Sequence, residues 1–353
     1  MNFPALSVTF GNSDWQFWSW LGPAAVIGAA LISASMTHLL HPLLTRYALA
    51  KPNTRSSHQR STPQGGGLAV ISATIGLASL LALSLAGITV SFRSDLLGIF
   101  CAALLVALVG AADDLSAVPV GARLLVQAIA VALVISTLPA DLSIIPLMPA
   151  WAERAMLFAG MLWFVNLVNF MDGIDWMTAA EVVPVAAGLA LVGLLGALPA
   201  YAVVVALALL GAMLGFAPFN RPVARIFLGD VGSLPIGLLL GWLFVLLAGR
   251  GHVAAALLLP LYYLADATIT LLRRFGNGEK IWQAHRTHFY QRATDNGFAV
   301  LDIVRRVFAL NIGLVTLALA TVWFDSRWAS FAALVLGSLA VGSLLVTFAR
   351  TRS

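Results

Sequence analysis

Long apolar runs dominate this sequence and leave few folds open to it. Most of them are near twenty residues long, and glycine, proline and charged residues separate them. A helix of about 20 apolar residues spans the hydrocarbon core of a bilayer. With 60% hydrophobic and only 10% charged residues, the chain has too few polar groups to cover a globular surface. The sequence therefore predicts an all-α polytopic membrane protein with about eleven transmembrane helices. The expected spans are 18–40, 66–90, 95–112, 122–139, 154–171, 181–197, 199–217, 232–249, 252–272, 306–323 and 328–348.

The connections between these spans are short, as at residues 198–200, where three residues separate two apolar runs. We therefore expect residues 1–353 to form a single integral membrane domain. The loops expected on its cytoplasmic side are 41–65, 113–122, 169–181, 218–231 and 273–305.

The positions of lysine and arginine predict the orientation of the bundle. Of the 20 basic residues, 16 fall after odd-numbered spans. The positive-inside rule then places the N-terminus outside and the C-terminus in the cytoplasm. No positive charge precedes the first apolar run, so no cleavable signal peptide is indicated. The net charge of +5 is a topology signal and does not imply nucleic-acid binding.

Five aspartates lie at the ends of apolar runs on this same predicted side. Asp113 and Asp114 end the third span, Asp172 and Asp175 end the fifth, and Asp230 precedes the eighth. Ionisable groups at membrane depth are costly and mark functional sites by default. The alternative is that each carboxylate caps a helix or pairs with an arginine. Carboxylates close together repel one another unless a cation lies between them, so the group as a whole favours a cation site.

Asparagine and aspartate recur every three residues before the sixth span. On a helix, Asn166, Asn169, Asp172 and Asp175 would form one slowly drifting stripe of oxygen ligands and amides. Oxygen-only clusters suit Mg²⁺, which binds through one or two carboxylates plus substrate phosphates. The sequence therefore predicts a magnesium–diphosphate site at the level of the lipid headgroups.

Basic residues crowd the first cytoplasmic loop, where Lys51, Arg55 and Arg60 precede the run Gly65–Gly67. Such a segment can bind phosphate through side-chain charge and exposed backbone amides. An ordinary positive-inside anchor is the alternative.

The longest cytoplasmic loop carries two histidines three residues apart, His285 and His288, with Arg286 between them. A zinc site is disfavoured because the glutamate of the usual motif and the cysteine ligands are absent. Phosphate contact by these histidines and arginine is the interpretation we favour. Asp266 lies within the ninth span, where an ion pair or hydrogen bond is at least as good an explanation as catalysis.

Five motifs resemble those of the polyprenyl-phosphate N-acetylhexosamine-1-phosphate transferases, glycosyltransferase family 4, in the order found in that family. The resemblance extends from about Pro52 to Asp295, and eleven spans also fit it. It implies transfer of a sugar 1-phosphate from a UDP-N-acetylhexosamine to undecaprenyl phosphate, with release of UMP. It further implies a multi-pass protein of the bacterial inner membrane, with Mg²⁺ as cofactor and a homodimer as its assembly. The motifs are KPNTRSSHQRSTPQGGG, GAADDLSAVP, NLVNFMDGIDWM, FNRPVARIFLGDVGSLPIG and HRTHFYQR.

The resemblance also implies roles for single residues. Asp230, with Asp172, is expected to bind magnesium, and Phe227 to stack on uracil. Asn169, Asp175 and Asn220 are similar to nucleotide-binding or ordering positions. Catalytic roles are implied for Asp113 and Asp114, of which Asp113 is favoured to act on the lipid phosphate, and for Asp172. His285 and His288 match the histidine-bearing loop of the family.

The chain departs from the family pattern at three places. Ala117 stands where many relatives have a third acidic residue, and Trp176 stands where glycine is common, which puts the tight turn expected there in doubt. The histidine motif is HRTH, unlike the triple-histidine form of the phospho-muramoyl-pentapeptide translocase. This favours an enzyme that initiates O-antigen or another cell-envelope polysaccharide. The peptidoglycan transferase stays open as an alternative, as does a non-enzymatic transporter, although no internal repeat supports the latter.

Overall fold

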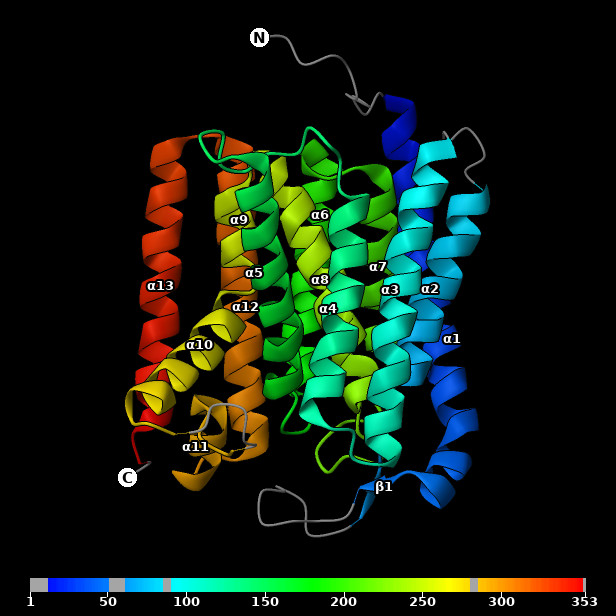
Figure 1. Cartoon of the computed structure of the whole chain (residues 1–353), viewed down its shortest axis with the longest axis vertical. Coiled ribbons are helices and arrows are strands. Elements are labelled where there is room, and N and C mark those ends of the chain that lie inside the picture. Colours follow the sequence, from blue (N-terminus) through cyan, green and yellow to red (C-terminus); the bar gives the residue numbers. More distant parts are fainter. Residues whose placement is uncertain (1–11, 51–60, 85–89, 280–284, 352–353) are drawn as a thin grey trace.

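The computed structural model describes residues 12–50, 61–84, 90–279 and 285–351. Its helices lie side by side in one bundle, and the first helix begins on the face opposite to the one where the last helix ends (Figure 1). The helices are α1 (Asn12–Tyr47), α2 (Gly67–Ser84), α3 (Val90–Leu115), α4 (Val120–Thr137), α5 (Ala150–Met171), α6 (Met177–Val192), α7 (Ala200–Phe216), α8 (Asp230–Gly249), α9 (Val253–Leu258), α10 (Leu261–Gly276), α11 (Phe289–Asp295), α12 (Val300–Phe324) and α13 (Arg327–Ala349).

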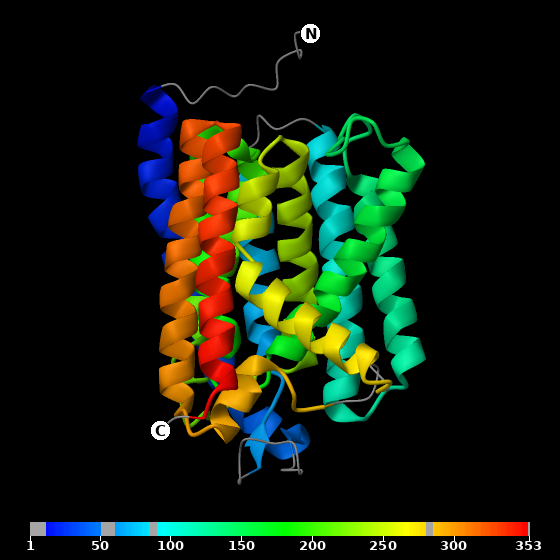
Figure 2. The ribbon, with the colours of Figure 1, turned by 90° about the vertical axis from the view of Figure 1, so that its left-hand side faces the viewer.

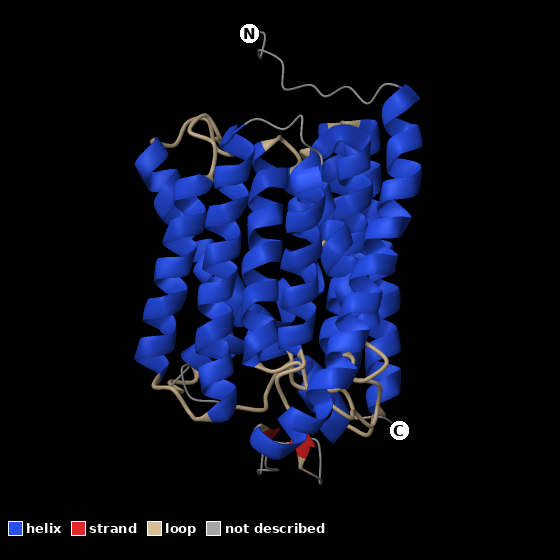
Figure 3. Cartoon of the chain, turned by 90° about the vertical axis from the view of Figure 1, so that its right-hand side faces the viewer, coloured by secondary structure: helices blue, strands red, loops and turns tan. Residues whose placement is uncertain are grey.

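The structure confirms a helical, multi-pass membrane protein. Eight helices of the described part are long and apolar enough to cross a membrane, one of them α6 with the π-helical turn Gly193–Ala197 that follows it. Within the same residues, the apolar stretches Gly67–Ala82 and Ala200–Phe216 are shorter. Two two-residue strands, β1 (Leu49–Ala50) and β2 (Thr62–Pro63), pair antiparallel at one end of the bundle (Figure 3).

Proline marks several helix boundaries. Pro119, Pro149 and Pro199 immediately precede α4, α5 and α7. Proline suits such positions because the first N–H groups of a helix lack an intrahelical acceptor in any case. Pro260 has the opposite effect, because it separates α9 from α10 in a segment predicted as one continuous span. That prediction was wrong: α10 runs obliquely across the bundle, as Figure 2 shows.

The boundaries of two predicted loops also need correction. Helix α1 continues to Tyr47, so the first seven residues of the loop expected to begin at residue 41 are helical. The loop expected at residues 273–305 holds the end of α10, all of α11 and the start of α12. Charged residues near a span end do not stop a helix, because their long side chains reach the polar interface while the backbone stays helical.

Helix α8 lies at the centre of the bundle and is buried along the whole of its apolar window. It packs against α2, α3 and α5. A Cβ built on Gly67 would lie 2.1 Å from the Cα of Gly232, and one on Gly110 would lie 2.4 Å from the backbone carbon of Asp230. Main chain therefore touches main chain on two sides of the first turn of α8, and these contacts fix the position of Asp230.

Candidate active site

A cavity of about 200 Å³ opens where the ends of α3, α5 and α8 meet. Its lining combines carboxylates, amides and one aromatic ring, and it brings together segments that are far apart in the sequence. The lining residues are Gln64, Asp114, Asn169, Asp172, Gly173, Ile174, Asp175, Asn220, Phe227, Leu228, Gly229 and Asp230. The four aspartates of this lining come from three of the predicted loops, and the structure brings these loops together at one end of the bundle.

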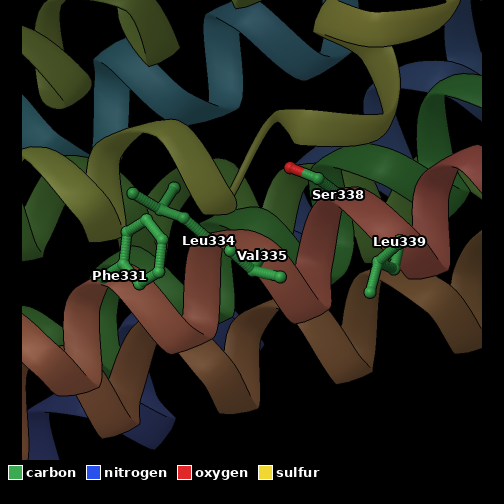
Figure 4. Close-up of a pocket in the computed structure, with 5 residues that line it drawn as sticks. All are labelled: Phe331, Leu334, Val335, Ser338 and Leu339. Carbon is green, nitrogen blue, oxygen red and sulfur yellow. The ribbon is translucent and has the colours of Figure 1, made fainter.

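A larger hollow of about 400 Å³ lies along α13 (Figure 4). Its lining consists of Phe331, Leu334, Val335, Ser338 and Leu339. None of these side chains is charged, and only one carries a polar atom. Size alone does not make this hollow an active site, because phosphoryl chemistry needs charged or polar groups that converge on the reacting atoms.

Asp114 anchors the start of α8. Its two carboxylate oxygens accept hydrogen bonds from the backbone N–H groups of Asp230, at 2.9 Å, and Val231, at 3.1 Å. A carboxylate at this place accepts hydrogen bonds from N–H groups that have no acceptor within the helix. Its negative charge also interacts favourably with the positive end of the helix dipole. Gly229, the residue before Asp230, has φ 77°, and a Cβ there would lie 2.4 Å from Asp114 Oδ2. Glycine is therefore needed at this position for two separate reasons.

The carboxylate of Asp230 is held from two sides. Asn169 Nδ2 donates to Oδ1 at 2.7 Å, and Arg123 Nη1 donates to Oδ2 at 3.0 Å. The same arginine nitrogen donates to Asp113 Oδ2 at 2.6 Å, while the backbone N–H of Val118 donates to Asp113 Oδ1. The adjacent aspartates thus have different partners: Asp114 bonds to backbone, and Asp113 forms an ion pair beside the cavity.

The predicted helical stripe of asparagines and aspartates is wrong beyond Met171. Helix α5 ends there, and Asp172 has the non-helical angles φ −86° and ψ 53°. The four side chains consequently separate: Asn166 donates to Gln127, Asn169 reaches Asp230, and Asp172 accepts from Thr178. The period of three describes the sequence, but the chain leaves the helix at Asp172 and turns between Ile174 and Met177, so the last members point elsewhere.

A turn built on Trp176 closes this segment. Trp176 has φ 62°, a left-handed conformation that costs a non-glycine residue about 1–2 kcal/mol. Its backbone N–H donates to Asn220 Oδ1 at 2.8 Å, and its indole Nε1 donates to the carbonyl of Ala217. Asp175 Oδ2 accepts from the backbone N–H of Ala224. The tight turn that the tryptophan put in doubt is therefore formed, and hydrogen bonds to the α7–α8 loop hold it.

The short strands bring the end of the α1–α2 connection to the cavity. Gln64 follows β2 and bridges to Phe227 in parallel, and the N–H of Phe227 donates to the carbonyl of Pro63 at 2.8 Å. Gln64 Nε2 donates to the backbone carbonyl of Asp114. Sequence reasoning missed Gln64, although its place between Pro63 and Gly65–Gly67 marked a sharp turn. Lys51, Arg55 and Arg60 lie outside the described residues, so their phosphate role stays a prediction.

Asp172 has a strongly altered acidity. Burial raises the pKa of its carboxyl group from 3.8 to about 7, the hydrogen bond from Thr178 opposes this, and the negative charges of Asp230 and Asp175 add to it. A carboxyl group with this pKa is poised between its two protonation states near neutrality. A cation beside it would favour the ionised form.

The histidine loop lies next to the cavity wall but does not line the cavity. His288 is 2% exposed and stacks on His285, with ring centroids 4.8 Å apart, and on Tyr290. The hydroxyl of Tyr290 donates to the carbonyl of Phe170 at 3.0 Å, one residue from Asn169. Arg286 donates to Thr294 and pairs with Asp295, both in the last turn of α11, the helix that directly follows it. This loop therefore supports the end of α5 from outside.

Asp266 holds that loop in place. It is fully buried and accepts hydrogen bonds from the backbone N–H groups of Phe289, at 2.9 Å, and Tyr290, at 3.1 Å. The hydroxyl of Tyr262 also donates to it, and His288 Nδ1 lies 3.4 Å from its Oδ1. The hydrogen-bonding alternative foreseen for Asp266 is thus the one the structure supports, and the partner is the start of α11.

The oxygen donors at the cavity fit magnesium. Asp172 and Asp230 both line it, and Asn169 and Gln64 add amide oxygens. Among the described residues, no three histidine, cysteine, aspartate or glutamate side chains form a metal-binding group. Mg²⁺ does not need three, because it commonly binds one or two carboxylates and completes its shell with water and substrate phosphate.

The sequence of this chain is similar to those of known membrane glycosyl transferases. The model of glycosyl transferase family 4 matches residues 96–248, which include the ends of α3 and α5 and all of α8. A probable undecaprenyl-phosphate N-acetylglucosaminyl 1-phosphate transferase of Bacillus subtilis (strain 168) is 25% identical over 319 residues, covering 85% of this chain and 87% of that protein. The decaprenyl-phosphate N-acetylglucosaminephosphotransferase of Mycolicibacterium smegmatis is 29% identical, covering 92% of this chain and 87% of its own length. The enzyme of that name from Mycobacterium leprae is 28% identical over 90% of this chain and 88% of its own.

The match to glycosyl transferase family 4 thus covers the helices whose carboxylates meet at one end of the bundle. Over most of its length, the chain is similar in sequence to polyprenyl-phosphate N-acetylglucosamine 1-phosphate transferases, which supports a relationship to that family.

Proposed function

We propose that the protein transfers N-acetylhexosamine 1-phosphate from a UDP-sugar to undecaprenyl phosphate, forming a lipid diphosphosugar and releasing UMP. One observation carries this proposal: the carboxylates of Asp172 and Asp230 and the ring of Phe227 line a single cavity at the end of the bundle. An oxygen of the lipid phosphate forms the new bond to the sugar-bearing phosphorus, and the bond from that phosphorus to the leaving UMP oxygen breaks. The names of the bacterial relatives support the same reaction class.

In this proposal Asp230 and Asp172 hold Mg²⁺. When bound, Mg²⁺ supplies neutralisation of the charge that develops on the diphosphate and the leaving UMP. Asn169 orients the Asp230 carboxylate, to which it donates at 2.7 Å. Phe227 offers an aromatic face to the uracil ring.

Other residues shape the nucleotide side of the cavity. Asn220 bonds to Trp176 N–H and to the carbonyl of Ile226, so we assign it to ordering the loop that carries Phe227. Asp175 ties the same loop to the turn after α5. In this proposal, the role of the histidine loop is to hold the turn after α5 in shape. Its residues are His285, Arg286 and His288.

A strong general base is not required for this reaction. A phosphate monoester loses its second proton near neutrality, so close and aligned approach matters more than proton abstraction. We assign Asp114 to placing the first turn of α8, which it does through two backbone hydrogen bonds. Asp113 remains the favoured residue on the lipid-phosphate side.

We infer the topology from the charge distribution. Eleven spans, with α9 and α10 together as one broken span, would leave the N-terminus outside and the cavity in the cytoplasm, where 16 of the 20 basic residues would also lie. The single domain, its five cytoplasmic loops and the homodimer belong to this proposal. We propose the bacterial inner membrane as its location, and the bacterial origin of the relatives supports this.

N-acetylglucosamine is the first donor to test, because the relatives are named for it. The role we propose is initiation of O-antigen or another cell-envelope polysaccharide. Purified protein should release UMP from a UDP-N-acetylhexosamine only when undecaprenyl phosphate and magnesium are both present. A panel with N-acetylglucosamine, N-acetylfucosamine and N-acetylquinovosamine donors would identify the sugar. If no donor gave magnesium-dependent UMP release, the proposal would fail.

A further inference from the structure

Arg123 has bonding capacity that its ion pairs leave unused. It lies in the first turn of α4, and its side chain is 26% exposed. A single nitrogen, Nη1, makes both of its contacts, to Asp113 at 2.6 Å and to Asp230 at 3.0 Å. Within the described part of the chain, no group accepts a hydrogen bond from its Nε or Nη2. An arginine side chain carries five N–H donors in a planar fork, so most of the fork stays open.

Two carboxylates hold this fork in a fixed place. Asp113 is itself fixed, because its second oxygen accepts the backbone N–H of Val118 at 2.7 Å. Asp230 is fixed by Asn169 and by the packing of α8. Holding a flexible side chain in advance lowers the entropic cost of binding a ligand to it. The arrangement therefore presents a pre-oriented cation beside the cavity.

The surroundings of Arg123 face the lipid rather than the nucleotide. Arg123 is absent from the cavity lining, whereas Asp230, its partner, belongs to it. The next two residues of α4, Leu124 and Leu125, are 39% and 62% exposed. Exposed leucines on a helix apolar enough to span a membrane point to acyl chains. Arg123 thus lies between the carboxylate cluster and the bilayer.

We propose that Arg123 binds the phosphate monoester of the lipid acceptor through Nε and Nη2, with Asp113 as the positioning residue that orients the guanidinium. This inference rests on the proposed function. A lipid phosphate that approached Asp230 without a cation would meet only negative charge from this side. The guanidinium fork matches two phosphate oxygens at once, which an ammonium group cannot do.

The first experiment measures binding without turnover. Wild-type protein in nanodiscs with EDTA should bind undecaprenyl phosphate at least about tenfold more tightly than undecaprenol, as seen by native mass spectrometry. Arg123→Gln should remove this preference. Arg46→Gln is the matched control, because Arg46 is an exposed arginine at the same end of the bundle, over the ring of Tyr47, and should keep the preference. Equal preference in the wild type and in Arg123→Gln would overturn the inference.

The second experiment separates the two substrates. Arg123→Lys keeps the charge but loses the fork, so KM for undecaprenyl phosphate should rise about tenfold while KM for the UDP-sugar stays within about twofold. Equal increases in both KM values would overturn the inference, since they would indicate a purely structural ion pair. A rise confined to the UDP-sugar would do the same, because the fork would then serve the diphosphate. Binding of UMP to each variant, measured by calorimetry, reports a folded nucleotide site.

These results also separate this inference from the proposed function. If the wild type neither binds UMP nor transfers a sugar phosphate, the proposed function fails. If it does both and Arg123→Lys leaves the KM for the lipid phosphate unchanged, only the role of Arg123 fails.

Discussion

Asp114 and Asp266 have the same structural role in two parts of the molecule. Each accepts two backbone N–H groups from the start of a helix that lies elsewhere in the sequence: α8 for Asp114 and α11 for Asp266. Asp114 lines the cavity, whereas Asp266 has no exposed surface. The first anchor therefore adds charge to the site itself, and the second acts only through the loop that it holds.

The comparison shows why a costly carboxylate in a membrane protein need not be catalytic. Backbone N–H groups at a helix start are obligatory donors, and a carboxylate satisfies two of them at once. Exposure to the cavity distinguishes an anchor that can also contact substrate from one that cannot. Four predictions test this distinction, from the largest effect to the smallest.

Asp230→Asn should abolish UMP release, by about a thousandfold or more, because the charge that places the metal is lost. The α8 N–H groups that bind Asp114 would remain, so the anchor itself is untouched. Thermal unfolding should stay close to that of the wild type, and circular dichroism should show the same helix content. Near-normal turnover in this variant would contradict the assignment of Asp230.

The two anchors should differ when each is replaced by alanine. Asp266→Ala strands several buried donors and should lower the free energy of unfolding by about 3–5 kcal/mol. Asp114→Ala should lower the free energy of unfolding by about 1–2 kcal/mol, as for loss of a helix cap. For each kcal/mol of stability lost, it should reduce turnover more than Asp266→Ala does. Denaturant unfolding in detergent and UMP release measure the two effects. The asparagine variants are the controls, since asparagine keeps an acceptor oxygen. Equal losses of stability would show that burial does not separate the anchors.

Magnesium affinity should depend on pH through Asp172, whose pKa is raised to about 7. Below that pH the carboxyl group holds a proton that a cation must displace, so the apparent Kd for Mg²⁺ should rise by up to about tenfold per pH unit. Without a cation, the contribution of Asp172 to the free energy of unfolding falls as pH rises from about 4 to about 7, because the folded chain holds this proton more tightly than the unfolded chain.

Calorimetric titration of Mg²⁺ in the presence of UMP, between pH 6 and pH 8, would measure this dependence. Asp172→Asn should remove it, because asparagine does not titrate. A wild-type Kd that is constant over this range would contradict the prediction.

Ala117→Asp should have the smallest effect. Ala117 is exposed and lies beyond the end of α3, away from the backbone donors that anchor Asp114. Turnover should stay within about twofold and stability within about 0.5 kcal/mol of the wild type. Ala117→Asn controls for side-chain size. A change of about tenfold in turnover would instead revive a requirement for three aspartates at this end.

Hydrophobicity was enough to predict the bundle, and charge was enough to predict that the aspartate loops meet at one end. Their separate roles could not be predicted. The bond from Asp230 N–H to Asp114 joins residues 116 positions apart, and it depends on the close approach of α3 and α8 at Gly110. No periodicity in the sequence reports such a contact.

Local geometry was the second limit. The spacing of Asn166, Asn169, Asp172 and Asp175 fits a helix, yet the helix ends at Met171. Trp176 then adopts a conformation that its residue type disfavours, because Asn220 and the carbonyl of Ala217 bind it from another loop. Tertiary hydrogen bonds decided the turn against local preference. In the sequence, Arg123 counted only among the basic residues that predict the orientation of the bundle. Its ion pairs could not be predicted, because both partners lie on other helices.

The order of the chain has a consequence for biosynthesis. Every residue that lines the cavity lies between Gln64 and Asp230, whereas α10 to α13 follow it in sequence. A chain that leaves the ribosome from its N-terminus therefore completes the cavity wall before its last helices are made. Tyr290 then arrives and bonds to the carbonyl of Phe170, behind the turn at Gly173. The segment that carries the histidines and α11 is therefore made after the cavity wall and before α12 and α13, so it can support the wall only once the wall itself has been made.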